Sequence, residues 1–184
     1  MDYIQTPEEL FEFMSKNIHY GYLGKNGRVY YDTDPDFDSE WSNQYILENS
    51  SDLLDHLYGN CWDQVEFERE WFSKNGYEIK TFFEMVMVDY ENPYPTHSFL
   101  IYKDSNGDWC WFENADFIHR GIHRFSSYDE LLDYQYNQYK ESLKEFNISD
   151  DEIGKIIITC FDKPKEHASS KEYIAHCIAS KRIR

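Results

Sequence analysis

The sequence predicts an α+β fold, in which a helix that begins with a cysteine packs on a small antiparallel sheet that carries a histidine and an acid, with further helices on the flanks. Capping sequences open several helices, short runs rich in β-branched and aromatic residues predict strands, and a hairpin turn joins two of those strands. A length of 184 residues suits one domain, and no repeat or low-complexity linker divides the chain. Residues 1–184 are therefore expected to form a single domain.

The N-terminal part opens with a helix-start sequence. Residues 6–9 combine an N-cap threonine, a proline at the first helical position and a capping-box glutamate, and predict a helix to about Asn17. Residues 18–49 are rich in Gly, Asp, Asn and Tyr and have few periodic signals, so this segment is expected to be irregular. A short helix is expected over residues 51–57.

A second helix is predicted to begin at Cys61. Gly59 and Asn60 end the preceding helix, large apolar side chains then recur at near-helical spacings, and the Asn-Gly pair at 75–76 is a C-terminal stop. The cysteine therefore lies in the first turn of this helix.

Four runs rich in strand-forming residues are expected to build the sheet. One more helix is expected between the third and fourth runs, and another after the fourth. The predicted strands span residues 77–89, 97–103, 108–114 and 155–161. One helix is opened by the capping box at 127–130 and runs to about residue 146, and a C-terminal helix begins near Ser170.

The hairpin between the second and third strands sets the register of the sheet. Asp104 at the first turn position and Gly107 at the fourth favour a three-residue loop, in which Asp104 pairs with Asp108. Phe99 then lies opposite Glu113. A two-residue Asn-Gly loop would shift this register by one residue.

The register decides which group lies beside His97. With the three-residue loop, His97, Phe99, Trp111 and Glu113 share one face, and His97 and Glu113 are diagonal neighbours with about 7–8 Å between their Cα atoms. The two-residue loop would place Asn114 there instead. Either side chain could accept a hydrogen bond from Nδ1 of His97, and the turn chemistry favours Glu113.

Cys61, His97 and the third group have the chemistry of a nucleophile, a base and the group that orients the base. Unpaired N–H groups at a helix start favour the thiolate form of a cysteine and can hold an oxyanion. Imidazole suits the transfer of a thiol proton near neutral pH. Candidate substrate-cleft residues beside them are Asn60, Trp62 and Trp111. A second oxyanion donor is sought among Tyr20, Tyr22 and Tyr58.

The order of these motifs resembles that of transglutaminase-like domains, which are relatives of papain-like cysteine proteases. Residues 59–61 match a G-x-C pattern at a helix start, and residues 97–99 stand where that family often has His-Ala-Trp. Trp109 is followed by the acid four residues later. The resemblance covers residues 50–115. The acid is Glu113 rather than the usual Asp, and Asn114 replaces the usual Pro.

The resemblance implies acyl transfer through a thioester, a reaction for which no cofactor is expected. Cys61 would attack an amide or thioester carbonyl of a peptide-like substrate, His97 would protonate the leaving amine, and Glu113 would hold the imidazole. Water would complete hydrolysis, and an amine would complete transamidation. The alternatives are a catalytically silent domain of the same fold that binds a protein partner, and acetyl transfer from a thioester donor, which needs a cofactor pocket.

The charge of the chain limits its partners. Eighteen Lys and Arg against 35 Asp and Glu give a net charge of −17 at pH 7. Such a field repels nucleic acid and anionic membrane surfaces and favours a peptide or protein substrate of basic character. No run approaches the roughly 20 apolar residues of a membrane span, and the N-terminus lacks a signal-peptide pattern, so a cytoplasmic location with four free cysteines is predicted.

No metal site is expected from the sequence. The aspartates at 32–38 lack the glycine and glutamate of a calcium-binding EF-hand loop, and Gly121 interrupts the pair His119 and His123. A last group does not fit a familiar zinc spacing. It consists of Cys160, His167, His176 and Cys177.

Overall fold

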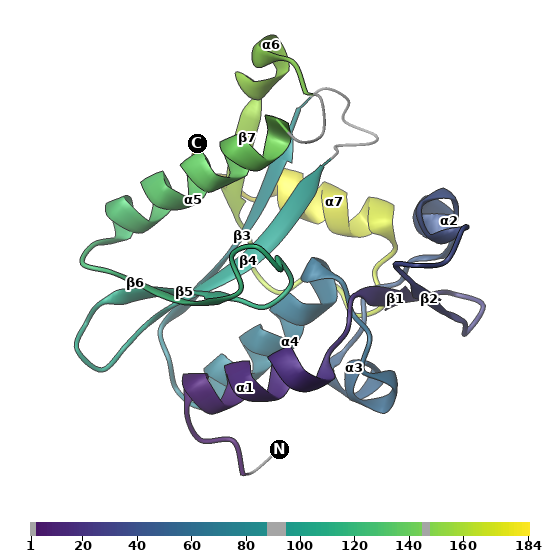
Figure 1. Cartoon of the computed structure of the whole chain (residues 1–184), viewed down its shortest axis with the longest axis horizontal. Coiled ribbons are helices and arrows are strands. Elements are labelled where there is room, and N and C mark those ends of the chain that lie inside the picture. Colours follow the sequence, from purple (N-terminus) through teal and green to yellow (C-terminus); the bar gives the residue numbers. More distant parts are fainter. Residues whose placement is uncertain (1–2, 88–94, 145–147) are drawn as a thin grey trace.

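A computed structural model describes residues 3–87, 95–144 and 148–184 of the protein (Figure 1). Within these ranges, seven helices and a two-stranded sheet accompany a six-stranded antiparallel sheet with strand order β6-β5-β4-β3-β7-β8. The predicted α+β class is therefore confirmed. None of the helices in the described ranges is both long and apolar enough to cross a membrane.

The elements follow one another along the chain with short connections. The helices are α1 (Pro7–Asn17), α2 (Phe37–Gln44), α3 (Ser50–His56), α4 (Cys61–Lys74), α5 (Tyr128–Leu143), α6 (Asp150–Ile153) and α7 (Ser170–Ala179). The strands are β1 (Gly21–Leu23), β2 (Val29–Tyr31), β3 (Ile79–Val86), β4 (Thr96–Lys103), β5 (Trp109–Glu113), β6 (Gly121–Phe125), β7 (Ile156–Cys160) and β8 (Lys181–Arg182).

Apolar side chains fill both faces of the large sheet, because successive residues of a strand point to opposite faces. One core joins α1, α4 and α7 to the face that carries Leu100 and Phe112. The other core joins α5 to the face that carries Phe99 and Trp111. The central strands are therefore covered on both sides, and only the ends of the strands can open to solvent.

Helix α4 begins at Cys61, as predicted, and a reciprocal cap fixes its first turn. The side chain of Asn60 accepts hydrogen bonds from the N–H groups of Trp62 (2.7 Å) and Asp63 (3.3 Å), and Asp63 accepts one from the Asn60 N–H (3.0 Å). The first eight residues of the helix are all buried. The cysteine is thus held at the start of a helix that the rest of the fold encloses.

The predicted hairpin register is also confirmed. Asp104 accepts from the N–H of Gly107 (3.0 Å) and donates its own N–H to the carbonyl of Asp108 (2.9 Å). Gly107 has a φ of +90°, a conformation that favours glycine. Leu100 pairs with Phe112 in the ladder, which puts Phe99 and Glu113 at matching positions.

Several parts of the chain depart from the sequence prediction, among them the short helix α6 and the two-residue strand β8, which were not predicted. Residues 18–49, expected to be irregular, contain β1, β2 and α2, which are held by a tertiary aromatic cluster rather than by a local pattern. In that cluster Tyr22 stacks on Tyr30 with 4.8 Å between ring centroids. Strand β6 was not predicted because its stability comes from pairing with β5. The C-terminal ends of the predicted segments 77–89 and 127–146 lie outside the described residues.

Candidate active site

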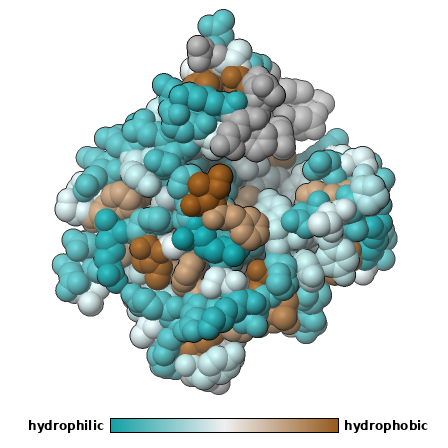
Figure 2. All heavy atoms as spheres, in the orientation of Figure 1, coloured by the Kyte–Doolittle hydropathy of each residue, from teal (hydrophilic) through white to brown (hydrophobic). Residues whose placement is uncertain are grey.

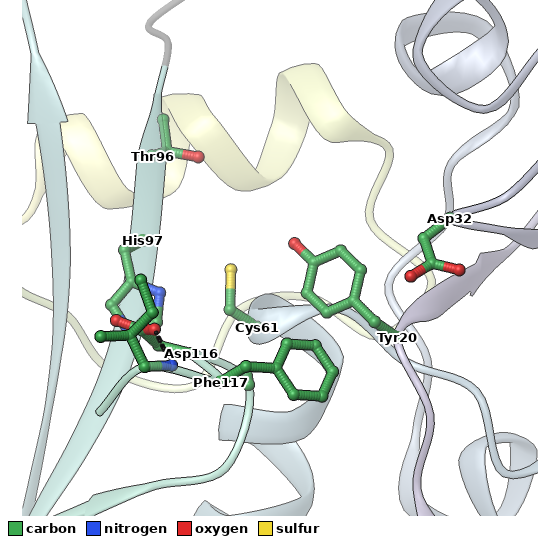
Figure 3. A pocket seen from close by; sticks show the side chains of 9 residues that line it. Tyr20, Asp32, Cys61, Thr96, His97, Asp116 and Phe117 are labelled. Carbon is green, nitrogen blue, oxygen red and sulfur yellow. Dashed lines mark hydrogen bonds between the residues drawn. The ribbon is translucent and has the colours of Figure 1, made fainter. Parts of the chain in front are cut away.

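Cys61 and His97 line one cavity of about 380 Å³ beyond the end of β5 (Figure 3). Helix α4 supplies the cysteine at its first position, and β4 supplies the histidine at its second. The proximity of the Cys61 side chain acts to raise the pKa of His97. The sulfur in Figure 3 lies between His97 and Tyr20, so a molecule that enters the cavity would meet the thiol and the imidazole together.

Glu113 is the hydrogen-bond partner of the His97 ring. One carboxylate oxygen lies 2.8 Å from Nε2 of His97, and the other accepts the backbone N–H of Asp116 at 2.7 Å. The Glu113 side chain is only 2% exposed and that of His97 is 16% exposed. The partner of His97 is thus the predicted one, but it binds Nε2 rather than Nδ1, which leaves Nδ1 as the nitrogen available to the thiol.

The surroundings of His97 favour its protonated form. Burial on its own lowers the pKa of His97, but the charge of Glu113, its hydrogen bond and the neighbouring Cys61 side chain outweigh this effect. The pKa of His97 therefore lies well above its usual value. An imidazolium beside a thiol stabilises the thiolate, which is the nucleophilic form.

His97 also borders a separate cavity, of about 230 Å³, on the α5 side of the sheet. Glu84 lies there directly opposite His97 in the β3–β4 ladder and is fully buried. Burial raises the pKa of Glu84 to about 8, and one of its oxygens accepts a hydrogen bond from Gln135 (3.3 Å). The sequence analysis missed Glu84. The only signal was an acidic residue between the apolar pairs Phe82–Phe83 and Met85–Val86 of the strand.

Asn114, the alternative third group, points elsewhere. Its side chain is fully buried and donates to the side-chain oxygen of Gln64 at 2.7 Å. Gln64 in turn donates to the carbonyl of Gly59 at 2.8 Å. Asn114 therefore ties the end of β5 to the start of α4, and the hairpin register explains why it does not reach the imidazole.

The three candidate cleft residues do not line the cavity at Cys61. Asn60 is the buried N-cap of α4, and Trp62 is buried in the core, stacked on Tyr173 with 4.3 Å between ring centroids. Trp111 is buried on the α5 side, where it stacks on His123 (4.8 Å). These residues support the site from behind, because large side chains next to a helix start or a strand end are needed for the core.

The other residues that line the cavity, apart from Thr96, come from the segments around 20–32 and 115–118. The second segment was not predicted as part of the site, and of the lining residues in the first only Tyr20 was considered. Of the three tyrosines considered as oxyanion donors, Tyr20 lines this cavity, and Figure 3 shows its hydroxyl directed toward the cysteine. The hydroxyl of Tyr22 donates to the Phe37 carbonyl (2.9 Å), and Tyr58 borders an adjoining cavity. Exposed aromatic residues in a loop were the available signal.

Comparison of the chain with models of protein families, with curated proteins and with solved structures gives no match. The evidence on function is therefore the geometry itself. It consists of a thiol at a helix start, an imidazole on the adjoining strand and a buried carboxylate behind that imidazole.

Proposed function

We propose that the protein is a cysteine-dependent acyl-transfer enzyme that acts on amide bonds of peptide-like substrates through a thioester. The observation that carries this proposal is the position of His97, whose ring lies 2.8 Å from the Glu113 carboxylate and which lines the same cavity as Cys61. A nucleophile, a base and a group that orients the base are the parts that such chemistry requires.

The proposed reaction begins with attack of the Cys61 thiolate on the amide carbonyl carbon. The carbonyl oxygen takes up the negative charge, and the His97 imidazolium gives its proton to the leaving nitrogen as the C–N bond breaks. The thioester is then attacked by water, with His97 taking the proton, or by a second amine. The first route releases an acid, the second forms a new amide, and both restore the thiol.

Two groups are proposed to hold the oxyanion. The N–H of Cys61 has no partner within its own helix, because the first N–H groups of a helix lack a preceding carbonyl. The hydroxyl of Tyr20 faces the same cavity from the opposite wall. Donors placed before the charge develops stabilise the transition state more than water would.

The transglutaminase-like or papain-like core is the architecture that we propose for this site. Support comes from a helix that begins with the cysteine and from an antiparallel sheet that carries the histidine and the acid on neighbouring strands. The substitution of Glu for the usual Asp is accommodated here, because the longer side chain spans the diagonal between Glu113 and His97.

Thiol alkylation separates an active enzyme from a catalytically silent domain of the same fold. Burial raises the pKa of the Cys110, Cys160 and Cys177 thiols, so these should react slowly with iodoacetamide at pH 6. We expect intact-mass spectra to show one fast alkylation, which Cys61→Ala removes and His97→Ala slows. His176→Ala, on the distant α7, is the matched control.

Turnover is tested on a panel of fluorogenic peptide amides. Cys61→Ala and His97→Ala should each abolish release of the amine, with unchanged far-ultraviolet circular dichroism. If Cys61 alkylates no faster than an ordinary thiol with a pKa of about 8.5, the proposal fails and the silent domain is the better description.

A further inference from the structure

The cavity at Cys61 continues into a second cavity of about 430 Å³, and the two cavities together form one groove. Three residues, Tyr20, Asp32 and Phe117, line both cavities. Figure 3 shows Asp32 on the far side of Tyr20 from the cysteine. A chain bound across the nucleophile would therefore place a neighbouring side chain near Asp32.

The rim of this groove, formed by Tyr31, Phe117 and Ile118, is unusually apolar for a surface. These side chains are 41%, 61% and 74% exposed, and only Tyr3 joins them as an exposed large hydrophobic residue in the described ranges. Figure 2 shows hydrophobic residues near the middle of this face, over the loop between β5 and β6. Exposed apolar groups that gather at a cavity mark a binding surface.

Asp32 is the one carboxylate that lines both cavities. Its neighbours Asp34 and Asp36 pair with Arg28 at 2.9 and 2.6 Å, whereas no ion pair found in residues 3–87, 95–144 and 148–184 includes Asp32. Asp32 is exposed to solvent. It therefore attracts a cation from outside the chain.

A positive side chain of the protein, Arg120, also borders the second cavity. Its Nε donates to the Asn114 carbonyl at 2.7 Å, and its guanidinium lies 4.1 Å from the centre of the Phe117 ring. These contacts anchor Arg120 to the wall on the β5 side. The chain as a whole carries a net charge of −17, which favours the approach of a cation to its surface.

We infer that Asp32, together with Tyr20 and Tyr31, forms a subsite for a lysine or arginine side chain of the peptide whose amide Cys61 attacks. This inference rests on the proposed function and names its substrate class. The aliphatic stem of the side chain would lie along the aromatic rings, and its charged end would meet the carboxylate. A glutamate at the same position would be repelled.

Binding is measured on Cys61→Ala protein, so the test does not depend on the thiol. The probes are fluorescent acetyl-Gly-X-Gly amides in which X is lysine, norleucine or glutamate, followed by fluorescence anisotropy. Norleucine keeps the stem of lysine without its charge. We expect the lysine peptide to bind about three- to fivefold more tightly than the norleucine peptide, as for an exposed ion pair, and the glutamate peptide to bind most weakly.

Asp32→Asn in the Cys61→Ala background should remove the preference for lysine, and 0.5 M NaCl should reduce it. Asp38→Asn, an exposed acid on α2 outside the groove, is the matched control and should keep the preference. Equal binding of lysine and norleucine, or a preference that survives Asp32→Asn, would overturn the inference. An inert Cys61 in the alkylation assay would refute the proposed function instead, so the two failures are distinguishable.

Discussion

Replacing Glu113 with glutamine tests how the carboxylate acts on His97. The substitution keeps the shape of the side chain but removes the charge that raises the pKa of His97. A glutamine has one carbonyl oxygen, whereas Glu113 accepts hydrogen bonds from both His97 (2.8 Å) and the Asp116 N–H (2.7 Å). The variant therefore loses the ion pair and leaves one of two buried donors without an acceptor.

The magnitude follows from the burial of the pair. With the Glu113 and His97 side chains 2% and 16% exposed, solvent screens their interaction little. A hydrogen bond to a charged group contributes about 1.5–3 kcal/mol, which corresponds to about a ten- to hundredfold change in the stability of the imidazolium. The pKa of His97 should fall accordingly, and the thiolate that the imidazolium stabilises should become less populated in weak acid.

The assay is the rate of iodoacetamide alkylation between pH 4.5 and 9. In Glu113→Gln we expect the acid limb of the rate profile to move up by about one to two pH units. Glu113→Asp keeps the charge and should leave the limb nearer its original position, while Glu141→Gln, on the exposed face of α5, should leave it unchanged. A profile that is the same in Glu113→Gln and in the unsubstituted protein would refute the role of this ion pair.

The remaining predictions concern stability, measured as the free energy of unfolding in urea. The Glu84 carboxyl loses its proton near pH 4.5 in the unfolded chain but near pH 8 in the folded protein, so the free energy of unfolding falls as pH rises through this window. Glu84→Gln should therefore add about 2–5 kcal/mol to the free energy of unfolding at pH 8 and little at pH 4. An equal gain at both pH values would contradict the argument from burial. Asn60→Ala should cost about 1 kcal/mol and Asn60→Gly only a few tenths, because glycine is a tolerated N-cap; equal costs would argue against the cap. Asn114→Ala should cost about 1–3 kcal/mol through the lost bond to Gln64, yet slow turnover less than Glu113→Gln does; the opposite order would mean that Asn114 serves the imidazole.

Local chemistry was sufficient to predict the parts of the site that depend on neighbouring residues. The cap at Asn60 fixes where α4 begins, and the turn at Asp104 and Gly107 fixes which residue of β5 meets His97. Turn and cap geometry are set over about four residues, so a single sequence contains the necessary information. Once the turn fixes the register, the alternation of side chains between the two faces of the sheet selects Glu113 rather than Asn114 as the partner of His97.

The parts that could not be predicted depend on contacts between distant segments. Tyr20 enters the cavity because residues 18–49 fold through a cluster of stacked aromatic rings, which no periodic pattern reveals. The choice of Nε2 over Nδ1 depends on the side-chain angle of His97, and the register does not determine it. The burial of Trp62 depends on α7, which lies more than a hundred residues along the chain.

Helix α4 is enclosed over its first eight residues, whereas the groove that faces Cys61 is bordered by exposed loop residues such as Phe117. A change near the start of the helix would disturb the packing of the core that joins α1, α4 and α7 to the sheet, but a change at the rim would alter only what enters. The proposed nucleophile and the proposed selectivity can therefore diverge independently during evolution. New substrates can be acquired by exchanging rim residues while the reactive centre is inherited intact.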